Sequence, residues 1–224
     1  MDLFTIIGMK NAVIIALFIP IVKELIIMKR SIMDSFIKWK NRKSKKPLLL
    51  KGVRQCGKTY ILKEFGAHHY QETAYFNFEG NPALTERFEQ DLDPARIIME
   101  LGVLRGKKIT PGSTLLIFDE IQFCNKALTS LKYFCEQTPE YDITCAGSLL
   151  GIALSKPLSF PVGKVDMFTL LPMSFYEFVL ANEENMLLEY CENLNLQTKI
   201  PKIFADKLST LLSTYYITGG MPEA

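Results

Sequence analysis

The chain has 224 residues, of which 48% are hydrophobic and 22% are charged, so it can bury a core as one large domain or one domain with an appendage. Its formal net charge of +2 argues against bulk binding to nucleic acid, which needs a strongly basic balance. Its five cysteines form no close pair and its two histidines are adjacent, which excludes a disulfide framework, a cysteine zinc site and a histidine-rich metal centre.

An apolar segment opens the chain. Residues 12–22 are uncharged and apolar, but this run is well short of the roughly 20 residues that span a bilayer as a helix. It is also a poor signal sequence, because Asp2 precedes it and no small-residue cleavage pattern follows Pro20. Three interpretations stay open: a marginal membrane-seeking segment, a helix packed on the core, or an extension upstream of a true start at Met28. We expect no membrane contact and, because the scattered cysteines are typical of reduced thiols, a cytoplasmic protein.

A basic cluster comes next along the chain. The segment from Met28 to Lys51 holds nine Lys or Arg against Asp34 alone, a net of +8 that leaves −6 for the rest of the chain. Within it, residues 38–46 (KWKNRKSKK) place Trp39 among the cations, a pattern that can bind single-stranded nucleic acid by phosphate contact and base stacking. The other interpretation, commoner for so short a cluster, is a solvated helix end and linker with the tryptophan in the core.

The next segment predicts a strand, a glycine loop and a helix. Residues 47–52 (PLLLKG) form a short apolar run that suits a strand buried on both faces. Residues 58–65 then contain helix-forming and apolar side chains, and we expect Gly66 to end this helix.

The glycine loop matches a phosphate-binding pattern. Gly52, Gly57, Lys58 and Thr59 satisfy GxxxxGK[ST], the P-loop motif. Its glycines let consecutive N–H groups point at phosphate oxygens, and the following helix adds its positive end. In this pattern Lys58 bridges the β- and γ-phosphates and the Thr59 hydroxyl binds Mg2+. The alternative, an ordinary strand-to-helix turn, leaves the flanking strand and helix as coincidences. The predicted nucleotide-binding residues are Gly52, Val53, Arg54, Gln55, Cys56, Gly57, Lys58, Thr59 and Tyr60.

Three loop residues have a second interpretation. Arg54 and Gln55 either reach the nucleotide or a neighbouring subunit, or are solvated spacers. Cys56 is either an oxidisable thiol near a helix N-terminus or, as most cysteines are, a small inert filler, which we favour.

The rest of the chain alternates strands and helices, which predicts an α/β fold with a mainly parallel sheet covered on both faces. The predicted elements are a strand at 73–80, a helix at 93–104, a strand at 114–118, a helix at 125–137, a strand at 141–146 and a helical C-terminal part at about 174–216.

Two acids come directly after the buried strand at 114–118. In the sequence LLIFDE, Asp119 is placed to hold Mg2+ through water, and Glu120 is placed to polarise the water that attacks the γ-phosphate. The alternative is that both acids cap the next turn. Beside a P-loop motif, the metal and catalytic interpretation is the stronger one.

Three motifs carry a resemblance to a known family. The segments GVRQCGKT, TLLIFDEIQ and AGSLLG resemble, in order and spacing, a prokaryotic group of AAA-superfamily P-loop ATPases that usually precede a C-terminal domain of unknown function. The resemblance runs from about Met28 to the end. It implies a three-layer P-loop NTPase fold, ATP and Mg2+ as cofactors, and the strand at 141–146 between the P-loop strand and the Asp119 strand. It also puts Ser148 at a catalytic sensor position, although a Gly-Ser turn is an equal alternative.

The resemblance also bears on organisation. Residues 161–180 resemble the segment that closes the ATPase core in this group, and GGMPE resembles the entry to the domain after that core. We therefore expect an extension at 1–27, an ATPase core at 28–170 and a helical segment at 171–224, the start of a further domain in a truncated chain. Relatives commonly have arginine after the glycine that Gly163 matches, but this chain has Lys164, which cannot offer the planar fork of an arginine finger.

These motifs lead to two functional hypotheses. The first is an ATP-binding protein that hydrolyses ATP with Mg2+ and couples hydrolysis to a conformational change in a partner-binding role. The second is a nucleotide-gated module that binds DNA or a protein with little or no hydrolysis. Both leave a homo-oligomer open, and the choice of ATP over GTP rests on the resemblance, since no NKxD-type guanine reader comes after the Asp119 strand.

Overall fold

A computed structural model describes residues 30–147, 161–194 and 200–222. These residues form two compact units. The larger unit consists of the described residues from Arg30 to Met173 together with those from Tyr216 onward, and the smaller unit consists of those from Ser174 to Tyr215. The predicted extension at 1–27 lies outside the described residues, and the predicted domain limits at 28–170 and 171–224 stay predictions.

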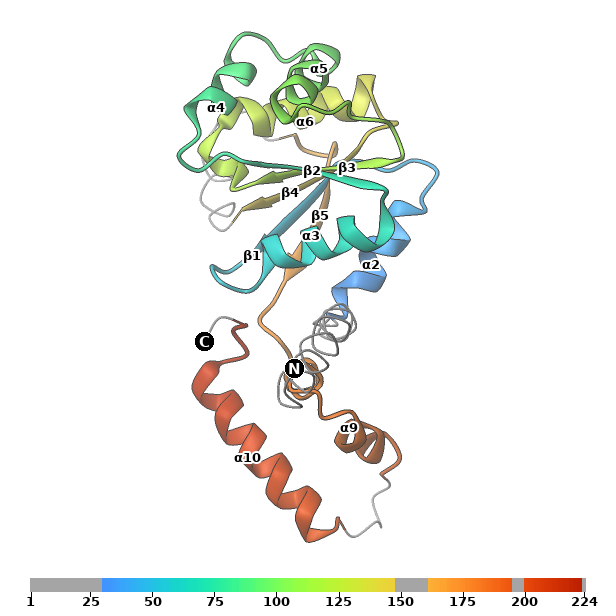
Figure 1. Ribbon diagram of the computed structural model, residues 1–224, viewed down its shortest axis with the longest axis vertical. Coiled ribbons are helices and arrows are strands. Elements are labelled where there is room, and N and C mark those ends of the chain that lie inside the picture. The colour runs from blue at the N-terminus through green and yellow to red at the C-terminus, as the bar shows by residue number, and fades with distance from the viewer. Residues whose placement is uncertain (1–29, 148–160, 195–199, 223–224) are drawn as a thin grey trace, which may run out of the picture. The chain divides into compact units, whose positions relative to one another are not determined.

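The larger unit is built on a parallel sheet, which within the described residues has five strands in the order β2-β3-β4-β1-β5 (Figure 1). As the resemblance implied, β4 lies between β1 and β3. Because all the strands run the same way, their carboxyl ends meet at one edge, where ligands of α/β folds bind. The strands are β1 (Leu48–Gly52), β2 (Glu72–Asn77), β3 (Thr114–Asp119), β4 (Asp142–Gly147) and β5 (Asp166–Leu170).

Helices cover both faces of this sheet (Figure 1). One face carries α2 and α3, and the other carries α4, α5 and α6. The three layers confirm the predicted α/β fold with a mainly parallel sheet. The helices are α2 (Ile32–Lys40), α3 (Lys58–His69), α4 (Pro82–Glu89), α5 (Pro94–Arg105) and α6 (Asn125–Gln137).

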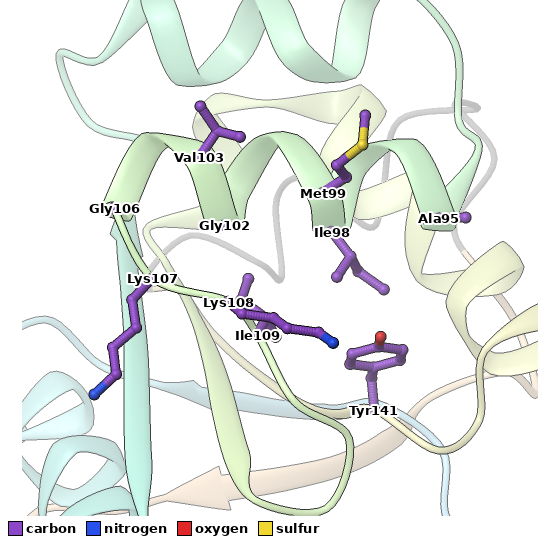
Figure 2. A pocket seen from close by; sticks show the side chains of 10 residues that line it. All are labelled: Ala95, Ile98, Met99, Gly102, Val103, Gly106, Lys107, Lys108, Ile109 and Tyr141. Atoms are coloured by element: carbon purple, nitrogen blue, oxygen red, sulfur yellow. The ribbon is translucent and has the colours of Figure 1, made fainter.

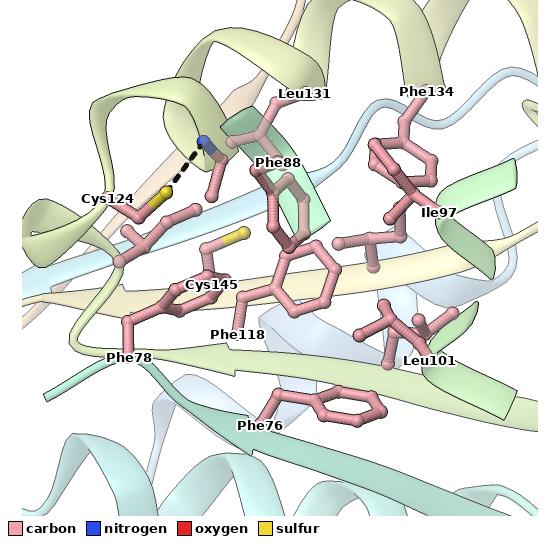
Figure 3. Packing of buried hydrophobic residues seen from close by; sticks show 14 of the residues in the cluster. Phe76, Phe78, Phe88, Ile97, Leu101, Phe118, Cys124, Leu131, Phe134 and Cys145 are labelled. Carbon is pink, nitrogen blue, oxygen red and sulfur yellow. Dashed lines mark hydrogen bonds between the residues drawn. The ribbon is translucent and has the colours of Figure 1, made fainter. Parts of the chain in front are cut away.

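Strand β3 is buried at every position, because both of its faces are covered. On the face of α4 to α6, Phe118 packs among aromatic rings (Figure 3), with its ring centroid 5.8 Å from those of Phe78 and Phe88 and 6.2 Å from that of Phe134. Aromatic edge-to-face contacts of this kind add to the stabilisation from burial. Since Phe118 directly precedes Asp119, this packing fixes the strand end that carries the acid.

Helix α3 is longer than the sequence predicts. It runs to His69, so the prediction that Gly66 ends it is wrong. A Cβ atom at Gly66 would lie 2.3 Å from Oγ1 of Thr73 on β2. Glycine is therefore present because helix and strand approach closely, and not because the helix ends there.

Sequence analysis missed several elements, among them helix α4 and strand β5, and it predicted one strand too long. Helix α4 begins at Pro82, where the Asn81 side chain accepts a hydrogen bond from the Leu84 N–H as an N-cap. Among the described strands, β1 is the one that pairs with β5, and Met167 of β5 is exposed, so β5 lacks the continuous apolar run of a buried strand. The strand predicted at 73–80 ends at Asn77.

The tryptophan of the basic cluster at 38–46 is in the folded core, whereas Lys38, Arg42 and Lys43 are exposed. Trp39 is 0% exposed, and its Nε1 donates to the Lys46 carbonyl at 2.9 Å. The Lys45 ammonium lies 2.5 Å from the carboxylate of Asp142, which is itself buried. The interpretation that the tryptophan stacks on nucleic-acid bases is therefore wrong, and the linker interpretation agrees with this packing.

The smaller unit is helical, as predicted for the C-terminal part. It begins with a capping box in which Ser174 and Glu177 each accept a hydrogen bond from the other's backbone N–H. Its core contains Val179 and Leu187, and the rings of Tyr190 and Phe204 stack with centroids 4.2 Å apart. Within the described part of the chain, no helix has the length and apolarity to cross a membrane. The helices are α8 (Phe175–Ala181), α9 (Asn185–Glu192) and α10 (Lys202–Thr218), whose last turn belongs to the larger unit.

Candidate functional site

The loop between β1 and α3 curls around a lysine ammonium group. Lys58 is only 6% exposed, and its Nζ donates to the carbonyls of Gly52 at 3.1 Å and Val53 at 2.7 Å. The curl depends on two left-handed residues, Gln55 with φ +63° and Gly57 with φ +89°, the second of which is the N-cap of α3. This backbone sets the loop at the positive end of a helix, as a phosphate cradle requires.

The first glycine of the motif is required by the neighbouring strand. A Cβ atom at Gly52 would lie 2.5 Å from the Leu170 carbonyl of β5 and 2.9 Å from Cys56 Sγ. Cys56 is buried, with Sγ 3.7 Å from the same carbonyl, so it fills the space beneath the loop. This agrees with the interpretation of Cys56 as a small filler. An oxidisable thiol would need an exposed sulfur, and this sulfur is buried.

A threonine and an acid from distant parts of the sequence meet at the carboxyl edge. Thr59 is the second residue of α3 and Asp119 is the last residue of β3. The Thr59 hydroxyl donates to Asp119 Oδ2 at 2.8 Å. Asp119 is only 3% exposed, so its carboxylate depends on nearby donors in place of water.

Two further groups hold the same carboxylate. The Tyr75 hydroxyl on β2 also donates to Asp119 Oδ2 at 2.8 Å, and the Glu120 N–H donates to Oδ1 at 3.1 Å. Burial, together with the hydrogen bond to Asp119, raises the pKa of Tyr75, so the phenol remains a donor at neutral pH. Sequence analysis missed Tyr75. Tyr75 could not be linked to Asp119 from the sequence, because the sequence does not show that β2 pairs with β3 and sets Asn77 opposite Asp119.

Glu120 has a constrained backbone and a side-chain partner. Its φ of +50° is in the left-handed region, which costs energy for any residue other than glycine. Its carboxylate accepts a hydrogen bond from the Gln122 side-chain amide. The predicted general base is therefore next to Asp119 and engaged by a second polar group.

An arginine supports the loop from outside the motif. Arg30 is buried and donates to the Cys56 carbonyl at 3.2 Å and to the Leu171 carbonyl at 2.6 Å. Pro222 lies near the same loop, because its Cγ is 3.5 Å from the position that a Cβ atom would take at Gly57. No sequence signal pointed to Arg30, and the resemblance related Pro222, in GGMPE, to a further domain and not to the loop.

The remaining predicted residues divide into three groups. Val53, Arg54, Gln55 and Tyr60 are exposed around the loop, and the structure gives Arg54 and Gln55 no side-chain role. Ser148 lies outside the described residues. Lys164, which the resemblance alone sets at the position of an arginine, pairs with Glu136 on α6, with Nζ and Oε1 2.8 Å apart.

The oxygen ligands at the carboxyl edge suit Mg2+. Among the described residues, no group of three or more His, Cys, Asp or Glu side chains is arranged to hold a metal ion by itself. Mg2+ needs no such group, because it keeps several waters and uses one or two protein oxygens together with substrate phosphates. The adjacent hydroxyl of Thr59 and carboxylate of Asp119 are donors of that kind.

Comparison with known proteins identifies the fold. The model of a family described as "AAA domain" matches residues 44–179, which is more than half of the chain. This stretch includes the curled loop and the Asp119 strand, so the parallel sheet with its flanking helices is a P-loop AAA-like fold. No curated protein matches the sequence significantly.

Several solved structures are similar at low sequence identity. PCH-2 from C. elegans is 13% identical with a TM-score of 0.46, over 80% of this chain and 52% of its own. ORC from Drosophila, solved bound to DNA, is 15% identical with a TM-score of 0.49, over 85% and 57%. RuvB from Thermotoga maritima is 18% identical with a TM-score of 0.45, over 70% and 49%. The chain thus spans about half the length of these three structures.

Proposed function

The chain belongs to the AAA-domain family, and from that premise we propose that it binds ATP with Mg2+ at the β1–α3 loop and hydrolyses it. We further propose that hydrolysis drives a conformational change in a partner-binding role, with DNA or a protein as partner and with a homo-oligomer as one mode of assembly. The five unpaired cysteines agree with a cytoplasmic location.

One observation carries the proposal. Thr59 and Asp119 are 60 residues apart in sequence, yet their side chains are joined by a hydrogen bond of 2.8 Å beside the curled loop. P-loop nucleotide hydrolases place a hydroxyl and an acid together in this way to hold Mg2+ next to the phosphates. A turn that merely joined a strand to a helix would not need the acid there.

Each side chain has a proposed task. Lys58 would exchange its carbonyl partners, Gly52 and Val53, for β- and γ-phosphate oxygens, while the loop N–H groups hold the phosphates. Thr59 and Asp119 would hold the metal, the Asp119 carboxylate through water. When bound, Mg2+ supplies positive charge that stabilises the phosphate oxygens. Glu120 would orient and polarise the attacking water once it leaves the Gln122 amide.

The proposal predicts different effects for two substitutions. Lys58→Ala should abolish ATP binding measured by calorimetry, because it removes the only ammonium group that the loop encloses among the described residues. Glu120→Gln should keep ATP binding and lose hydrolysis measured by phosphate release. Lys132→Ala on α6 is the control, since it removes an exposed lysine away from the loop. Unchanged ATP affinity in Lys58→Ala would show that the loop is not the nucleotide site.

Two contacts favour the second candidate, a nucleotide-gated DNA- or protein-binding module with little hydrolysis. Lys164 pairs with Glu136, so the position of the arginine finger carries an engaged lysine. Glu120 accepts a hydrogen bond from the Gln122 side chain, which the general base would have to give up before it could polarise a water. Phosphate release measured with and without added DNA separates the candidates. Turnover in either condition supports the hydrolase, and absence of turnover in both, with ATP binding intact, supports the binding module.

A further inference from the structure

A cavity of about 500 Å³ lies under helix α5 (Figure 2), within the size range that binds small organic ligands. It is bounded by α5, by the segment that leads from α5 toward β3, and by the residue that precedes β4. The lining residues are Ala95, Ile98, Met99, Gly102, Val103, Gly106, Lys107, Lys108, Ile109 and Tyr141.

The cavity is separate from the proposed nucleotide site. Tyr141 directly precedes β4, and Ile109 precedes β3, so this part of the lining is at the amino edge of the sheet. The curled loop comes after β1 at the carboxyl edge. No residue of the loop or of the Asp119 site lines the cavity.

A helix glycine keeps the space open. Gly102 lies inside α5, where glycine is less favourable than alanine for helix formation. A Cβ atom there would meet the Lys107 carbonyl oxygen at 3.5 Å and other atoms at 3.9 Å, which are ordinary contact distances. Packing therefore does not require glycine at this position, in contrast with Gly66. A larger side chain at Gly102 would project into the cavity.

The polar side chains of the lining are all hydrogen-bond donors. Figure 2 shows the Lys108 side chain extending toward Tyr141, whose hydroxyl points toward α5. Lys107 is paired with Glu72. Of the two lysines that line the cavity in the described structure, Lys108 is therefore the one whose ammonium group can bind a ligand. No acidic residue lines the cavity. Glu140 is exposed beside Tyr141 and, after burial, contributes to the raised pKa of that phenol.

The rim of the cavity is apolar and open to solvent. Met99 is 64% exposed and Val103 is 78% exposed, and both belong to the lining. Large exposed apolar side chains beside a cavity are typical of a binding surface. A ligand that extends over this rim would bury their side chains.

We propose that this cavity binds a small amphipathic anion, a molecule with an apolar chain or ring in the cavity and a carboxylate at Lys108 and Tyr141. The apolar lining selects the body of the ligand, and the two donors select its charged group. The proposal is independent of nucleotide binding, because the two sites share no residue.

Calorimetric titration with decanoate tests the proposal directly. We expect saturable binding of one decanoate per chain, and at least tenfold weaker binding of decyltrimethylammonium, which has the opposite charge. Gly102→Leu should reduce decanoate affinity at least tenfold, because its side chain fills the cavity while leucine favours the helix. Lys108→Glu should weaken decanoate binding and not that of the cation.

The matched control is Leu104→Ala. Leu104 is an exposed apolar residue of α5 that does not line the cavity, so decanoate affinity should stay unchanged. Circular dichroism confirms that each variant is folded. Equal loss of decanoate affinity in Leu104→Ala and Gly102→Leu would show unspecific binding to apolar surface and would overturn the proposal. Equal affinities for the anion and the cation, or no saturable binding, would also overturn it.

Discussion

At the scale of single residues, the site depends on how Asp119 is held. Its buried carboxylate accepts hydrogen bonds from the Thr59 and Tyr75 hydroxyls and from the Glu120 N–H. A hydroxyl that binds a metal through its oxygen can still donate its proton to a neighbouring acid, so the Thr59 contact is compatible with Mg2+. We therefore infer that Tyr75 is a positioning residue, because its hydroxyl donates to the acid and so orients it.

This role predicts a specific defect in Tyr75→Phe. The substitution removes one hydrogen bond to a charged group, worth about 1.5–3 kcal/mol. We expect the Mg2+ concentration for half-maximal ATP binding to rise about tenfold or more, and ATP binding without Mg2+ to stay unchanged. Titration of Mg2+ into protein with a fluorescent ATP analogue measures both quantities. Tyr133→Phe on α6 is the control. A loss of affinity of the same size without Mg2+ would assign Tyr75 a merely structural role.

At the scale of elements, the contact between α3 and β2 sets the geometry of the site. Gly66 lets the helix approach Thr73, and the same helix and strand carry Thr59 and Tyr75. Lys63 of α3 strengthens the contact, since its Nζ lies 3.8 Å from the centre of the Tyr75 ring. An error in this packing would therefore displace two of the side chains that hold Asp119.

The close approach predicts the effects of two glycine substitutions. Gly66→Ala should lower the free energy of unfolding by about 1–3 kcal/mol, because its Cβ would overlap the Thr73 side chain. Adding Thr73→Ala should restore part of this loss by removing the overlapping atoms. Gly102→Ala in α5 is the control, and it should be neutral or stabilising by up to about 1 kcal/mol. Urea unfolding measures all four proteins, and an unaffected Gly66→Ala would contradict the packing argument.

The elements that sequence analysis predicted well are those with strong local signals. Strand β3 is a continuous apolar run because both faces are buried, and α6 has an apolar stripe, so both were found within a residue of their limits. Strand β5 lies at an edge and alternates exposed residues, and α4 is short, so their signals are weak. Gly66 was wrongly predicted to end its helix, because glycine is needed there for a close contact with β2, a strand that comes later in the sequence.

At the scale of the whole molecule, the sequence predicted which residues carry the proposed chemistry better than which residues support them. The P-loop motif is a local pattern that predicts the roles of Lys58 and Thr59. The role of Asp119 is predicted by its position at the end of a buried strand. Arg30 and Tyr75 act through the order of strands and the path of the chain, which no local pattern contains. Ser148 lies outside the described residues, and its proposed sensor role stays a prediction.

The central claim is that Thr59 and Asp119 hold one Mg2+ ion beside ATP at the loop that encloses Lys58. A double-mutant cycle with Thr59→Ala and Asp119→Asn, read by calorimetry of ATP binding with and without Mg2+, tests it most directly. Each substitution should weaken binding with Mg2+ about tenfold, which corresponds to about 1.4 kcal/mol. The double variant should be little worse than either single variant, and binding without Mg2+ should not change. Losses that multiply, or that are equally large without Mg2+, would contradict the account.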